Sequence, residues 1–132
     1  MRLVVVETPY AGNLIRRWLN RRYARRCLHD CLTRGEAPFA SHLLYTQPGV
    51  LRDGVVGERR LGIDAGLCWG RVAAASVIYT DRGISSGMAY GIAAASVAGR
   101  PVEYRSLSSG RGSCCSRGLL GWLFPGRGAP SA

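Results

Sequence analysis

Short β-branched runs alternate with longer helical patterns along this chain, and that alternation constrains its fold more than any other feature. The first run, residues 3–6, is continuously apolar, which is typical of a strand buried on both faces of a parallel sheet. Further strands are predicted at 39–45, 76–81 and 102–104. Right-handed crossovers between these strands give a parallel sheet with helices on both faces, a three-layer α/β domain of the Rossmann or flavodoxin-like kind.

Three helices are predicted to connect the strands, over residues 13–34, 57–75 and 85–98. Ser85 or Ser86 can cap the third helix. Apolar residues recur every three or four positions on the first helix and predict one buried face, made of Leu14, Ile15, Trp18, Leu19, Tyr23, Cys27, Leu28, Cys31 and Leu32. Glycines four apart on the second helix indicate a close backbone approach, which packing on the sheet explains: Gly62, Gly66 and Gly70.

The composition divides the chain into an α/β domain over residues 1–105 and a tail over residues 106–132. The tail is rich in glycine, serine and arginine, so we expect it to be flexible, with a short apolar patch at 119–125. The five cysteines form no regular framework and indicate reduced thiols. Because no run of eighteen apolar residues occurs, we expect no membrane contact and a cytoplasmic protein.

The net charge of +10 comes entirely from eighteen arginines, since the chain contains no lysine. Codon bias in a GC-rich genome explains this exclusivity without a nucleic-acid partner. Six of the arginines form a stripe on the first helix, at Arg16, Arg17, Arg21, Arg22, Arg25 and Arg26. A solvated helix face accounts for the stripe, while binding to nucleic acid or another anionic partner stays open as an alternative.

Residues that follow the predicted strands should share one edge of the sheet, where ligands bind in such folds. We predict that the substrate contacts there are Pro9, Tyr10, Gly12, Ser41, Tyr45 and Gly83. His42 and Asp81 are the candidate catalytic residues, because His42 can form a general-base pair with the carboxylate of Asp81 or of Glu7 where the two meet in space. A hydrogen-bonded histidine at a strand end and ordinary turn chemistry are the simpler alternatives.

Other common chemistries find no support in the sequence. It contains no nucleophile elbow, no phosphate-binding P-loop and no dinucleotide fingerprint after the first strand. Cys27, His29 and Cys31 do not converge on one helix face, and no further pair completes a tetrahedral site. We therefore predict neither a metal nor a cofactor.

Several ordered motifs resemble a family of small phage and bacterial proteins of uncharacterised function, related to the nucleoside 2-deoxyribosyltransferases. They include Thr-Pro-Tyr-Ala-Gly at 8–12, Gly-Ile-Asp-Ala-Gly-Leu-Cys-Trp-Gly at 62–70 and Gly-Arg-Pro-Val-Glu-Tyr-Arg at 99–105. The resemblance covers residues 3–105 and implies a nucleoside or nucleotide ligand. It also implies a homo-oligomer, and a bacterial host cell if the gene is phage-encoded.

The resemblance further implies a glutamate nucleophile on the helix after the third strand, which this chain lacks. The matching position is Ala89 or Gly91, and no acidic residue occurs between Asp81 and Glu103. We therefore predict nucleoside binding without the usual chemistry. The alternative is a weak N-glycosidase or deoxyribosyltransferase that uses another carboxylate, from Asp81, Asp64 or Glu7.

Overall fold

A computed structural model describes residues 1–108 of the chain, with four strands and four helices in that part. Strands and helices alternate, as the sequence predicted, except that a short helix follows the second strand. The elements are β1 (Arg2–Glu7), α1 (Leu14–Thr33), β2 (Glu36–Phe39), α2 (Ser41–Tyr45), α3 (Val56–Gly70), β3 (Ala75–Tyr79), α4 (Ser86–Val97) and β4 (Val102–Arg105).

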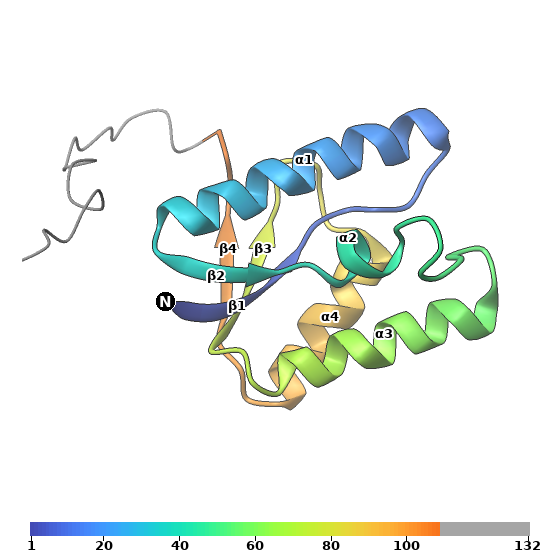
Figure 1. The fold of residues 1–132 in the computed structure, drawn as a ribbon. Coiled ribbons are helices and arrows are strands. Elements are labelled where there is room, and N and C mark those ends of the chain that lie inside the picture. The colour runs from blue at the N-terminus through green and yellow to red at the C-terminus, as the bar shows by residue number, and fades with distance from the viewer. Residues whose placement is uncertain (109–132) are drawn as a thin grey trace, which may run out of the picture.

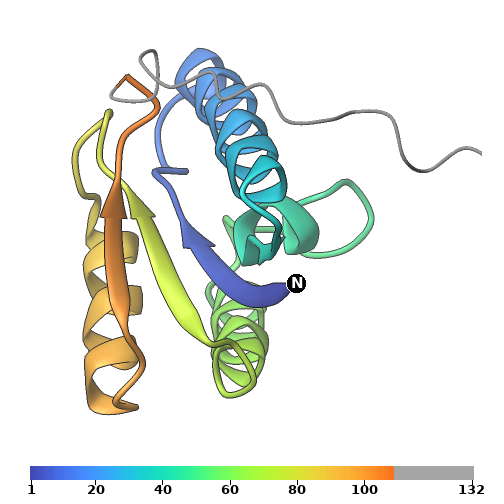
Figure 2. The ribbon, with the colours of Figure 1, turned by 90° about the vertical axis from the view of Figure 1, so that its left-hand side faces the viewer.

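All four strands are parallel and lie in the order β2-β1-β3-β4. The crossover through α1 runs to one side of β1, whereas those through α3 and α4 run to the other, so the helices cover both faces. Figures 1 and 2 show this arrangement, with α1 on one face of the sheet and α3 and α4 on the other. The predicted three-layer α/β fold is confirmed.

The core lies between the two central strands and the second half of α1. Val4, Val77 and Tyr79 are at most 1% exposed, and Cys27 and Cys31 from α1 are fully buried against them. Both thiols are free, as the cysteine count indicated. Apolar residues on both faces of β1 and β3 are buried because helices cover the sheet on each side.

The predicted second strand at 39–45 is wrong. The strand is Glu36–Phe39, and the residues that follow form the short helix α2. A buried carboxylate and a proline concealed this strand, because both are unusual in a sheet interior. Glu36 is tolerated because Arg105 donates two hydrogen bonds to it, at 2.7 and 2.8 Å, while Pro38 lies on an edge strand.

Of the nine residues on the predicted apolar face of α1, only Tyr23, Cys27 and Cys31 are buried. Leu14 is 86% exposed and Trp18 58%, although both belong to that face. A helix of 20 residues is about 30 Å long, whereas strands of 4 to 6 residues span about 13 to 20 Å. The first turns of α1 therefore extend past the sheet, as Figure 1 shows.

The remaining boundaries differ slightly from those predicted. The helix predicted at 57–75 ends at Gly70, and β3 begins at Ala75 instead of residue 76. Asn13 caps α1 and Ser85 caps α4, each accepting a hydrogen bond from a backbone N–H three residues later. Within residues 1–108 no helix has the length and apolar character needed to cross a membrane.

Candidate functional site

A cleft of about 330 Å³ opens next to the carboxyl end of β1. Here the chain leaves β1 for one face of the sheet and leaves β3 for the other, and such a divergence creates a crevice in parallel α/β folds. Residues from the β1 loop, α2, α3 and the start of α4 line it, including Glu7, Thr8, Tyr10, Ser41, His42 and Tyr45.

His42 lies in α2 and contacts the end of β1. Its Nε2 atom is 2.8 Å from Thr8 Oγ1, which makes a hydrogen bond between the two side chains. Burial lowers the pKa of His42 to about 4, so the imidazole is neutral near pH 7. A neutral imidazole with one nitrogen held by Thr8 can accept or donate one further hydrogen bond in the cleft.

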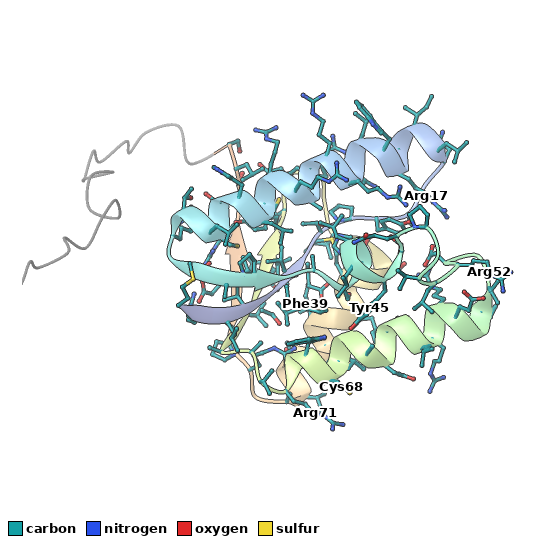
Figure 3. The ribbon with its side chains drawn as sticks, in the orientation of Figure 1. Arg17, Phe39, Tyr45, Arg52, Cys68 and Arg71 are labelled. Atoms are coloured by element: carbon teal, nitrogen blue, oxygen red, sulfur yellow. The ribbon has the colours of Figure 1, made fainter. Side chains whose placement is uncertain are left out.

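Two arginines of α1 hold the Tyr10 ring. The guanidinium carbons of Arg17 and Arg21 lie 5.6 and 5.8 Å from the ring centroid, and Arg21 Nη2 donates to the Tyr10 hydroxyl at 3.1 Å. Arg17 also pairs with Asp53 at 3.6 Å, and it points from α1 toward the loop before α3 (Figure 3). These contacts orient Tyr10 at the rim of the cleft.

Tyr45 is fixed between α2 and α3. Its ring lies 6.2 Å from that of Phe39, and Trp69 Nε1 donates to its hydroxyl at 3.1 Å. Figure 3 shows Phe39 and Tyr45 next to each other above α3. Because the hydroxyl and one edge are held, Tyr45 presents a positioned aromatic surface to the cleft.

The glycines of α3 allow α2 and the loop after it to lie close to this helix. A Cβ atom at Gly66 would lie 3.0 Å from the Ser41 Cβ, and one at Gly62 would lie 3.1 Å from a Leu51 methyl group. We expected these glycines to pack on the sheet, but Gly66 faces α2 and Gly62 faces the loop after it. Larger side chains here would push α2 and its loop away and change the shape of the cleft.

Glu7, the last residue of β1, brings a carboxyl group to the cleft wall. Among residues 1–108 it makes no hydrogen bond or ion pair. Burial raises the pKa of Glu7 to about 7, against the opposing charge of Arg100. Arg100 itself donates to Ser76 Oγ and to the Gly70 carbonyl, so its charge acts on Glu7 without a direct bond.

Asp81 has other partners and does not line the cleft. It accepts hydrogen bonds from the Tyr23 hydroxyl, the Ser106 hydroxyl and the backbone N–H groups of Leu107 and Ser108. Burial alone would raise the pKa of Asp81, but these four donors hold it below its usual range. The structure therefore does not bring Asp81 and His42 together as a pair.

Only some of the predicted substrate contacts line the cleft. Tyr10, Ser41 and Tyr45 line the cleft, whereas Pro9, Gly12 and Gly83 do not. Gly12 and Gly83 have positive φ angles of 140° and 76°, which explains glycine at both turns. Of the tail predicted at 106–132, the first three residues bind Asp81, and residues 109–132 lie outside the described part of the chain.

Sequence reasoning missed several cleft residues, among them Thr8 and Arg59. Thr8 follows β1 directly, so its position was a usable signal. Arg59 gave no such signal, because its place at the cleft depends on how α3 packs against α2, β1 and α4. It carries charge into the site and pairs with Asp53 at 3.1 Å.

The arginine stripe of α1 divides between two roles. Arg17 and Arg21 turn toward Tyr10 and the cleft rim, as described above. The other four are exposed and make no ion pair within the described residues: Arg16, Arg22, Arg25 and Arg26. Binding of nucleic acid or another anionic partner by these four stays a prediction.

Comparison with known proteins places this geometry in context. The model of a family described as "Domain of unknown function (DUF7768)" matches residues 2–105. A search of the curated proteins found no match. A 2-deoxyribosyltransferase from the psychrotolerant bacterium Bacillus psychrosaccharolyticus has a similar structure, with a TM-score of 0.57 and 19% identity over 79% of this chain and 72% of its own.

A second similar structure is a 2-deoxyribosyltransferase from Leishmania mexicana, with a TM-score of 0.53 and 11% identity. The match covers 80% of this chain and 65% of that one, slightly less than two thirds of its length. At these identities the two likenesses establish a shared flavodoxin-like fold. Activity belongs to the site and has to be argued from its residues.

Proposed function

This chain belongs to the family described as Domain of unknown function (DUF7768), and from its fold and its cleft we propose that it binds a nucleoside or nucleotide. The observation that carries the proposal is a cleft at the strand ends with both aromatic and hydroxyl groups. Its volume of about 330 Å³ falls in the range of small-molecule sites.

The cleft offers separate groups for the two halves of such a ligand. Tyr45, held by Phe39 and Trp69, presents an aromatic surface against which a base can stack. The hydroxyls of Thr8 and Ser41 lie in the same cleft and can bond to sugar hydroxyls. Asp81, predicted as a catalytic residue, has no part in this assignment, because its carboxylate binds residues 106–108.

Isothermal titration with deoxynucleosides, ribonucleosides and their 5′-monophosphates tests the proposal. We expect one member of the panel to bind, and Tyr45→Ala to weaken its affinity about tenfold through the lost stacking. Tyr104→Ala is the matched control, because Tyr104 is 59% exposed on β4 and outside the cleft. Silent titrations at millimolar ligand, or equal losses in both variants, would contradict the proposal.

A further inference from the structure

Gly91 on α4 lies directly against the carboxyl group of Glu7. A Cβ atom built on Gly91 would be 2.7 Å from Glu7 Cδ and 3.2 Å from its Oε2 atom, far closer than side chains pack. Both residues line the cleft. The Glu7 carboxyl therefore fills the space that a side chain at position 91 would enter.

This contact lies on α4, the helix on which the resemblance implies a glutamate nucleophile that this chain lacks. The helix contains no acidic residue, and Glu7 is the carboxylate that enters the cleft at this point instead, from the end of β1. A carboxyl group is thus present beside α4, but it comes from β1 and not from the helix itself. Glycine at position 91 is what makes the room for it.

The surroundings of Glu7 favour a reactive group over a structural one. A buried carboxylate normally gains a cation or several donors, as Glu36 does from Arg2 and Arg105. Glu7 is half-buried in the cleft wall and gains no such partner among residues 1–108, and the nearby Arg100 donates elsewhere. Because burial brings its pKa to about 7, both protonation states are populated at neutral pH, which suits a general acid.

On the basis of the proposed function, we propose that Glu7 is the catalytic acid for cleavage of the N-glycosidic bond of a nucleoside bound in the cleft. The C1′–N bond breaks, its electron pair stays on the base nitrogen, and that nitrogen takes the proton of the Glu7 carboxylic acid. A water oxygen then bonds to C1′. The water gives its proton to the Glu7 carboxylate, which restores the acid and yields free base and sugar.

Chromatography of the four common deoxynucleosides incubated with the full chain tests this activity. We expect release of free base from at least one, and a loss of about 100-fold in the Glu7→Gln variant, which cannot donate that proton. Asp64→Asn is the matched control: the sequence left Asp64 open as a catalytic carboxylate, but the structure places it exposed on α3 and outside the cleft. Turnover should also fall as pH rises through about 7, the pKa of Glu7.

A second variant pair tests the position of the carboxyl group. Glu7→Ala should remove base release, and adding Gly91→Asp should restore part of it, because the Cβ atom at position 91 lies at the place of the Glu7 carboxyl and the aspartate carboxyl is bonded directly to it. Binding of a deoxynucleoside without base release, or a Glu7→Gln variant with unchanged turnover, would overturn the inference and leave the proposed function intact. Absence of binding in titration would remove both.

Discussion

Replacement of Glu7 by glutamine should stabilise the protein in a manner that depends on pH. In the folded chain the pKa of Glu7 is raised from 4.5 to about 7 by burial, whereas the unfolded chain restores the ordinary value. As pH rises from 4.5, the unfolded chain releases this proton first, so the wild-type protein loses stability until pH passes about 7. Glutamine does not titrate and avoids this loss.

The size of the effect follows from those two pKa values. The pKa of Glu7 differs between 4.5 in the unfolded chain and about 7 in the folded one. At about 1.4 kcal/mol per pH unit, this difference changes the free energy of unfolding by about 3 kcal/mol. The stability gained by Glu7→Gln should therefore grow by that amount between about pH 5 and pH 8. His42 titrates identically in both proteins, so its contribution cancels in the difference.

Urea unfolding of both proteins across this pH range measures the difference directly. A gain of about 3 kcal/mol raises the urea midpoint by at least about 1 M at typical slopes. An exposed residue that does not ionise provides the control: Val97 is 91% exposed on α4, and the stability difference of Val97→Ala should stay constant with pH. A Glu7→Gln difference that is equally flat would refute the reasoning that Glu7 ionises against burial.

Two further predictions concern the hydrogen bonds of Asp81 and of Arg105. Asp81→Asn should speed hydrogen exchange at the Leu107 and Ser108 amides about tenfold, because both donate to that carboxylate, and unchanged exchange would contradict this. Arg105→Gln should cost about 3 to 5 kcal/mol at neutral pH, since it leaves Glu36 buried without its main partner. Glu36 holds its stabilising charge down to its pKa of about 2, so urea unfolding near that pH should show a much smaller cost.

Several parts of the fold were predictable because their signals are local. The run at residues 3–6 and the helix ends at Asn13 and Ser85 were all located from neighbouring residues. The second strand was not, because its buried Glu36 and its Pro38 contradict strand patterns unless Arg105 is known to be near. That arginine lies 69 residues after Glu36 in the chain.

The candidate site was predictable only in part. Tyr10 was identified because residues after strands tend to reach one edge of a parallel sheet. His42 and Tyr45 also line the cleft, but they do so from α2 and not from the strand predicted at 39–45. Asp81 also follows its strand, yet its donors from residues 106–108 hold it elsewhere. Position after a strand places a residue near the edge, but does not decide which neighbours it meets.

The sequence by itself determined the alternation of strands and helices, the buried core strands and the absence of an acidic residue on α4, because all three depend on residue types and short spacings. Tertiary structure alone decided that α1 extends past the sheet and that Glu7 occupies the space beside Gly91. The pairing of β1 with β3 brings those two distant positions together. Periodicity carries no information on such contacts, since it describes only which face of an element is apolar.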